Sequence, residues 1–216
     1  MKWTASISIK QIALAFITGL LVLVSLIGGF AAYQTRNVSE KLEQHSRNAA
    51  RSELAAAVER LVRQTERQAN ALANWDETRQ QLVLPEYYTY WRDQRVYESG
   101  ILPSRFARTA LYGPSGALLA PSPARHSLPA RLPANALSQQ PTSWLANDAG
   151  AVVLFHAFPV YSDERRQAML GHGLIRLDFM PVMLHLATLQ FTDLSSVSLA
   201  LKPGETLPMT KLFSRL

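Results

Sequence analysis

The chain has 216 residues, of which 48% are hydrophobic and 18% charged, so it holds enough apolar material for one membrane span and one packed domain. Its formal charge is +6, but the 22 basic residues are scattered along the chain, which argues against nucleic acid as a partner. The absence of cysteine excludes disulfides, thiol nucleophiles, Cys-ligated zinc and iron–sulfur clusters.

The first element that the sequence predicts is a transmembrane helix over residues 12–33, after a short N-terminal segment of residues 1–11. This run is uncharged, and at ~1.5 Å per residue a helix of its length crosses a bilayer core. A cleaved signal peptide is the alternative, because small residues around Ala31 form a passable cleavage site. The apolar run exceeds the ~7–15 residues typical of a signal peptide, which favours an uncleaved anchor with the rest of the chain exported.

A long helix is expected next, because residues 36–83 contain neither proline nor glycine and are rich in Ala, Glu, Arg, Gln and Leu. One face of this helix repeats at steps of four and three residues. Its positions are Leu54, Val58, Leu61, Thr65, Gln68, Leu72 and Trp75. Such a face either packs on its own domain or also pairs with a second copy of the chain, and the pattern leaves both readings open.

The remainder of the chain alternates turn signals with β-prone runs. We expect, in order, an aromatic segment after Pro85, a short helix from Pro103, a hairpin around the turn at 113–116, a proline-rich loop to Pro141, strands at 151–160 and 169–177, a helix from Asp178 to Leu189 and a last strand at 194–201. This order predicts an α+β fold with an antiparallel sheet and helices on one side.

Several of these features resemble the fourth type of CHASE domain, an extracellular sensory domain of bacterial membrane receptors. The features are Asn-Trp-Asp-Glu-Thr at 74–78, the aromatic segment Tyr87–Tyr97, Leu-Tyr-Gly-Pro-Ser-Gly-Ala-Leu at 111–118, Phe-Pro-Val-Tyr-Ser at 158–162, Gly171–Gly173, and Leu-Asp-Phe at 177–179. Each motif is short, but they follow one another in the family's order. The resemblance covers roughly residues 36–201, which is most of the chain.

The resemblance implies a ligand-sensing domain of PAS-like or Cache-like fold over residues 34–201, followed by a C-terminal segment of residues 202–216. It further implies a dimeric bacterial receptor with a small-molecule ligand, in which the sensory domain usually sits in the periplasm between two membrane helices. With one predicted span, this chain would be a single-pass protein of the inner membrane with its main domain in the periplasm. Relatives couple such domains to cyclic-di-GMP turnover or to a histidine kinase. This chain departs from that plan, because the residues after Leu201 are too few and too polar to span a bilayer. We therefore expect no enzymatic activity of its own and no cofactor.

Two neighbouring residues, Trp75 and Asp76, form the first candidate ligand site. An indole beside a carboxylate binds cationic or polar groups. The structural alternative is that Trp75 belongs to the core while Asp76 caps or braces a neighbouring segment.

Four further candidates are Tyr88, Tyr97, Arg105 and Arg176, which would line a pocket closed by the sheet. The arginines would select a carboxylate or a phosphate through their planar fork of donors. Each of the four also fits an ordinary surface position.

The five histidines show no metal-binding spacing, and no Gly-rich phosphate loop or nucleophile elbow is present, so no metal is expected. Two other functions remain as alternatives to a sensor. One is a membrane-tethered structural protein that binds a partner through its long helix, and the other is an exported hydrolase, whose catalytic residues the sequence does not display.

Overall fold

The computed structural model describes residues 9–102, 107–123, 127–163, 167–179, 181–182, 201–202 and 205–212. The chain divides into two compact units, residues 1–50 and residues 51–216. Helix α1 (Ile9–Asn74) begins in the first unit and ends in the second.

The described part of the first unit is helical, and its large apolar side chains, such as Phe16 and Phe30, are exposed. No helix in the described part of the chain has both the length and the apolarity that a membrane crossing requires. On this finding, the predicted transmembrane helix at 12–33 and the predicted single-pass location in an inner membrane are wrong.

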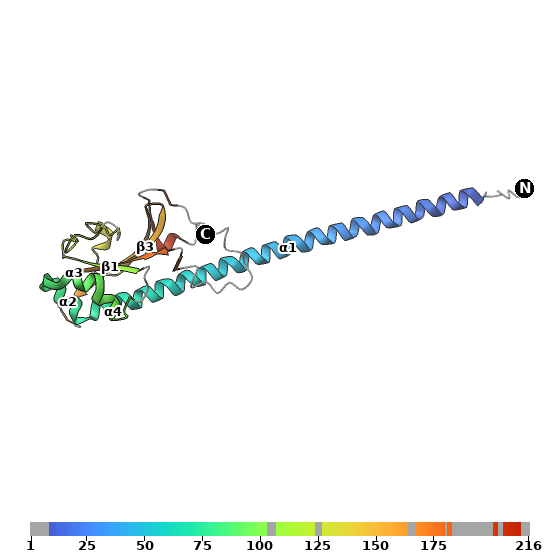
Figure 1. The fold of residues 1–216 in the computed structure, drawn as a ribbon. Coiled ribbons are helices and arrows are strands. Elements are labelled where there is room, and N and C mark those ends of the chain that lie inside the picture. The colour runs from blue at the N-terminus through green and yellow to red at the C-terminus, as the bar shows by residue number, and fades with distance from the viewer. Residues whose placement is uncertain are drawn as a thin grey trace, which may run out of the picture. The chain divides into compact units, whose positions relative to one another are not determined.

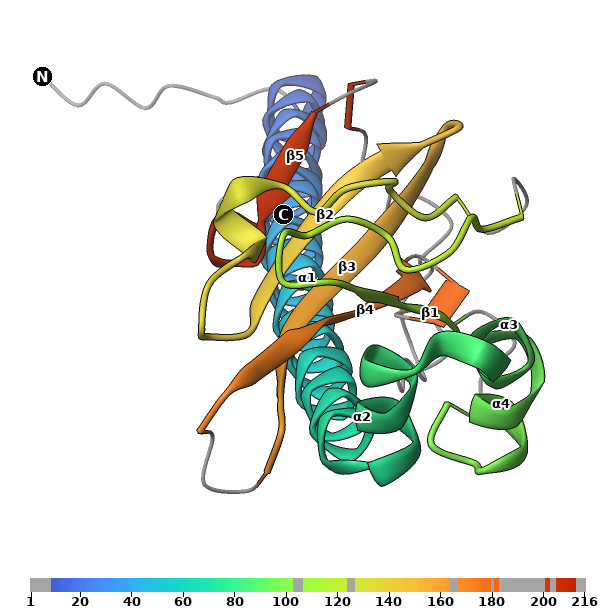
Figure 2. The same ribbon diagram turned by 90° about the vertical axis from the view of Figure 1, so that its left-hand side faces the viewer.

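The second unit is built on one five-stranded sheet in which all neighbouring strands are antiparallel. Its strands are β1 (Ala107–Tyr112), β2 (Thr142–Asp148), β3 (Ala151–Tyr161), β4 (Met169–Asp178) and β5 (Thr206–Pro208). The order across the sheet is β1-β4-β3-β2-β5, as Figure 2 shows. The predicted α+β class with an antiparallel sheet is confirmed, as are the strands expected at 151–160 and 169–177.

Short helical turns connect α1 to β1, and Figure 1 labels the α-helical ones. They are α2 (Asp76–Val83), η1 (Pro85–Tyr87), α3 (Tyr88–Tyr90), η2 (Trp91–Arg95) and α4 (Val96–Glu98), and two further turns follow later, η4 (Ala134–Ala136) and η6 (Met209–Lys211). The helix expected through residue 83 is interrupted at Trp75, whose φ of −77° and ψ of 125° are extended. The interruption starts a new helix with Asp76 and Glu77 in its first turn, where negative charge is favourable.

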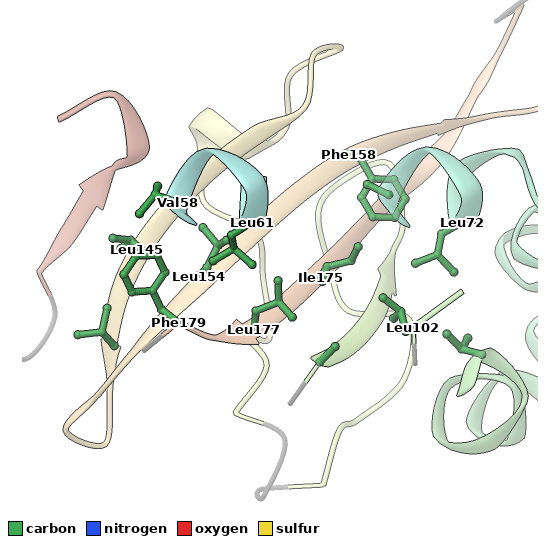
Figure 3. Close-up of a cluster of buried hydrophobic side chains, with 14 of the residues drawn as sticks. Val58, Leu61, Leu72, Leu102, Leu145, Leu154, Phe158, Ile175, Leu177 and Phe179 are labelled. Atoms are coloured by element: carbon green, nitrogen blue, oxygen red, sulfur yellow. The ribbon is translucent and has the colours of Figure 1, made fainter. Parts of the chain in front are cut away.

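The part of α1 from residue 51 on covers one face of the sheet. Leu54, Val58, Leu61 and Leu72 are at most 5% exposed and belong to one buried cluster with strand residues. Figure 3 shows this helix face directed at side chains from β2, β3 and β4. The face therefore packs on its own domain, which confirms one of the two readings of the pattern.

A second buried cluster lies on the opposite face of the sheet. Along β3, Leu154 and Phe158 belong to the cluster with α1, whereas Val153 and Phe155 belong to the other, because successive side chains of a strand point to opposite faces. The second cluster includes Leu132 and other residues from the long segment between β1 and β2. This segment thus covers the face of the sheet that α1 leaves open.

Several expected elements fall on parts of the chain that the structure does not describe. The short helix expected from Pro103 begins in residues 103–106, and the helix to Leu189 and the strand at 194–201 lie mostly within residues 183–200. Strands β2 and β5 were not predicted. Strand β5 falls in the expected C-terminal segment, where it pairs with β2.

Candidate functional site

A groove of about 330 Å³ opens on the sheet face away from α1. Strands β2 and β3 supply one wall, and the proline-rich segment that precedes β2 supplies the other. Its lining residues are Ser127, Leu128, Pro129, Pro133, Trp144, Ala146, Asn147, Asp148 and Phe155. The volume lies within the range of ~300–1,000 Å³ that is typical of small-molecule sites.

Two stacked aromatic rings lie in this groove. Trp144 of β2 and Phe155 of β3 are directly opposite each other in the sheet register, and their ring centroids are 5.4 Å apart with an interplanar angle of 24°. They are 6% and 7% exposed, so the sheet and the segment around them hold both rings in place. Cross-strand aromatic pairs of this kind stabilise the sheet, and the small part of each ring that stays exposed lines the groove.

Acidic side chains stand at one end of the groove. Arg176 on β4 donates from Nη2 to Oδ2 of Asp148 at 2.8 Å and from Nη1 to Oδ1 of Asp178 at 2.7 Å. The three formal charges leave a net charge of −1 at this end. Because Asp148 itself lines the groove, the arrangement attracts a positive group and repels a negative one.

Hydrogen bonds fix the walls of the groove. The Tyr112 hydroxyl on β1 donates to the carbonyl oxygen of Pro129 at 2.9 Å, which ties the proline-rich segment to the sheet. Burial raises the pKa of Tyr112, so this hydroxyl stays protonated and able to donate. At the β2–β3 turn, Asn147 accepts from the Gly150 backbone N–H at 2.9 Å. The groove is therefore formed by the fold before any ligand binds.

A separate aromatic cluster lies where α1 ends. Trp91 is 1% exposed, and its ring centroid lies 6.0 Å from that of Trp75 and 6.0 Å from that of Tyr88. Arg95 lies over the Trp75 ring at 5.8 Å and forms a two-pronged ion pair with Glu77. These contacts join the bend at Trp75 to the turns that follow it.

The buried Arg92 is the charged centre of this cluster. It lies in η2, a π-helical turn, and is 2% exposed. Its guanidinium pairs with Asp93 at 2.7 Å and donates to the Pro121 carbonyl oxygen at 3.0 Å. The hydrogen bond with Asp93 raises the pKa of Arg92, so the buried charge is paired and persists.

The tyrosines of the aromatic segment brace the backbone of β1. The Leu111 backbone N–H donates to the Tyr88 hydroxyl oxygen at 2.8 Å, and the Tyr97 hydroxyl donates to the Ala107 carbonyl oxygen at 3.1 Å. Desolvation by burial raises the pKa of both tyrosines. Both side chains thus act as neutral hydrogen-bonding groups that connect the helical turns to the sheet.

The structure places the six candidate residues at several different locations. It brings Trp75 and Tyr88 together around Trp91, with Tyr97 bonded to the start of β1. Asp76 is 93% exposed and pairs with Arg79. Arg176 pairs with Asp148, which lines the groove, but does not line the groove itself, and Arg105 lies outside the described residues. A ligand-binding role for any of the six stays a prediction.

The groove residues Trp144, Asp148 and Phe155 were not among those candidates. Residues Thr142 to Asp148 show no apolar–polar alternation, and their isolated tryptophan belongs to no motif that marks a site. Only the register of β2 on β3 brings this tryptophan against the phenylalanine.

Two histidines are buried in the sheet. His156 is 2% exposed and shares a hydrogen bond of 2.7 Å between its Nδ1 and the Ser143 hydroxyl, and burial lowers its pKa to about 4. His172 is fully buried, and burial lowers its pKa as well. Within the described ranges, no three His, Asp or Glu side chains gather in a way that could hold a metal ion.

No protein-family model matches the chain, and no curated protein and no solved structure matches it.

Proposed function

We propose that the second unit is a ligand-sensing domain that binds a small organic molecule in the groove on β2 and β3. The observation that carries this proposal is the combination, in the lining of one groove, of the aromatic pair Trp144 and Phe155 with the carboxylate of Asp148. A ring of the ligand would stack on the indole, while a positive group would lie against the carboxylate. The ligand class is therefore an aromatic or planar amine.

The proposal agrees with the resemblance to CHASE domains, whose relatives are sensors. A ligand alters the conformation of such a domain only if it binds one conformation more tightly than another, and the usual scale of this coupling is ~1–3 kcal/mol. The proline-rich wall of the groove, which Tyr112 ties to β1, is the part whose position a bound ligand would change most directly.

The test uses two probes of similar size and opposite charge, phenethylamine and 3-phenylpropionate, with thermal unfolding of the full chain as the readout. We expect phenethylamine to raise the melting temperature in a saturable way and 3-phenylpropionate to have a much weaker effect. The variant Asp148→Asn should reduce the phenethylamine effect at least tenfold in apparent affinity, whereas Asp76→Asn, at an exposed carboxylate outside the groove, should not.

Equal effects of the two probes, or an unchanged effect in Asp148→Asn, would contradict the proposed site. No effect of either probe on the wild-type chain would contradict the proposed class of ligand.

A second candidate function is self-association through α1. Its basis is a groove of about 630 Å³ along this helix, with mostly apolar lining, beside Met209 of η6. Ala55, Ala56 and Val62 line it and are only half-buried in the chain by itself. A second copy that packed there would remove this apolar surface from water.

The absence of native cysteine allows a direct test of this association. If α1 pairs with its copy, Ala56→Cys should form a disulfide-linked dimer under mild oxidation, while Arg67→Cys on the exposed side of the helix should not. A monomeric mass in solution together with equal crosslinking of both variants would exclude this candidate function.

A further inference from the structure

A second pocket, smaller and more polar than the groove, lies at the bend between α1 and α2. Its volume is about 80 Å³. The lining comes from four segments, namely the last turn of α1, the first turn of α2, the loop before β2 and the end of β3. Its polar lining includes Asn70, Asn74, Arg79, Gln139 and Asp163.

Charges of both signs line this pocket without neutralising each other. Arg79 is 17% exposed in its side chain, and its Nη1 pairs with Asp76 at the surface, at 2.8 Å. Asp163 accepts a hydrogen bond from the Gln167 backbone N–H at 3.2 Å. No ion pair forms between Arg79 and Asp163, although both are described and both line the pocket. The pocket therefore has a positive side and a negative side.

The guanidinium of Arg79 also has unused hydrogen-bonding capacity. Its Nε is buried and has no partner among the described residues. A buried donor without a partner is energetically unfavourable, so a ligand or ordered water that engages the guanidinium and lets it reorient relieves part of this cost. Amide side chains in the lining supply further donors and acceptors, as a polar ligand requires.

The size of the pocket limits what it can enclose. A cavity of ~150 Å³ holds a benzene ring of six non-hydrogen atoms, so about half that volume encloses only a compact polar group and leaves any substituent outside. A ligand with only a negative charge would be repelled by Asp163, and a ligand with only a positive charge would be repelled by Arg79. A group that carries both charges a few ångströms apart satisfies both sides at once.

We propose that the pocket at the α1–α2 bend binds the head group of a small zwitterion, an α-amino acid, with its carboxylate at Arg79 and its ammonium group at Asp163. This site is distinct from the groove on β2 and β3 and does not depend on the function proposed there. Because its lining combines α1, α2 and β3, an occupant would hold the helical bend against the end of the sheet.

The test measures binding of glycine, acetate and methylammonium to the full chain by isothermal titration calorimetry. We expect glycine to bind saturably, with acetate and methylammonium at least tenfold weaker, because each satisfies one side only. Arg79→Gln and Asp163→Asn should each weaken glycine binding at least tenfold. The matched control is Arg63→Gln, at an exposed arginine of α1 that pairs with Glu59 and does not line the pocket.

Folding of each variant is checked by circular dichroism, and Arg79→Lys, which keeps the charge but loses the planar fork, replaces Arg79→Gln if that variant fails to fold. Acetate binding as tight as glycine binding would overturn the assignment to a zwitterion. Full glycine affinity in the folded Arg79 and Asp163 variants would show that glycine binds elsewhere, and no glycine binding at all would show that the pocket is not an amino-acid site. Either result would overturn the proposal. Phenethylamine binding at the groove should be unchanged in the Arg79 variants, which separates the two sites.

Discussion

The contact between Gly173 and Phe158 sets how closely β3 and β4 pack under α1. A Cβ built on Gly173 would lie 2.8 Å from Cε1 of the Phe158 ring and closer still to Cζ and Cε2. Phe158 is 3% exposed and sits in the buried cluster with Leu72 of α1, so its ring has little room to move. Overpacking of this kind lowers the free energy of unfolding by ~1–3 kcal/mol. Replacing glycine by alanine also lowers the entropy of the unfolded chain, which raises the free energy of unfolding by ~0.4–1 kcal/mol.

We therefore expect Gly173→Ala to lower the free energy of unfolding by about 1–2 kcal/mol, measured by urea denaturation with tryptophan fluorescence. Gly113→Ala is the matched control, since a Cβ there meets nothing within 4 Å and its change should stay within ~0.5 kcal/mol. In a Phe158→Leu background, the cost of Gly173→Ala should largely disappear because the ring is gone. An equal cost in both backgrounds, or no cost in the wild type, would refute this account of the packing.

Three other predictions concern the core and its buried polar groups. Tyr88→Phe should lower the free energy of unfolding by ~1–3 kcal/mol, since it leaves the buried Leu111 N–H without its acceptor, and retention of full stability in urea would contradict this. Because the pKa of His156 is lowered to about 4 in the folded state, the unfolded state binds more protons between about pH 4 and 6.5. The free energy of unfolding should therefore rise with pH across this window by up to ~3 kcal/mol. His156→Gln should make this rise smaller, and any pH dependence that remains comes from other titratable groups. Leu61→Ala should lower the free energy of unfolding by ~2–5 kcal/mol, whereas Glu59→Ala, at an exposed position of α1, should change it little. Similar losses of stability in both variants would contradict the packing of this helix face.

The parts of the fold that were predicted correctly from the sequence are those with a strong hydrophobic pattern. The run Ala151 to Val160 is apolar except for His156 and is buried on both faces from Val152 on, so it identified β3. The alternating steps from Leu54 to Leu72 identified the buried face of α1. The interruption of the helix at Trp75 was missed, because nothing in residues 74–78 forbids a helix. It depends on a tertiary contact with Trp91, which local propensity does not register.

The candidate sites were harder to predict than the fold. Tyr88 and Arg176 were selected by residue type, but the structure uses their polar atoms to bind Leu111 and Asp148. The groove that we propose as the ligand site depends on the register of β2 against β3 and on the path of the proline-rich segment. Both are long-range features that no short motif encodes.

The central claim, that the groove on β2 and β3 binds a planar amine, is tested most directly by fluorine NMR of the full chain labelled with 5-fluorotryptophan. The Trp144 resonance is assigned by its absence in Trp144→Phe, and phenethylamine is then titrated. We predict a saturable shift of the Trp144 resonance while the resonances of Trp75 and Trp91, which belong to the other buried cluster, stay in place. An unmoved Trp144 resonance, or shifts confined to Trp75 and Trp91, would contradict the claim.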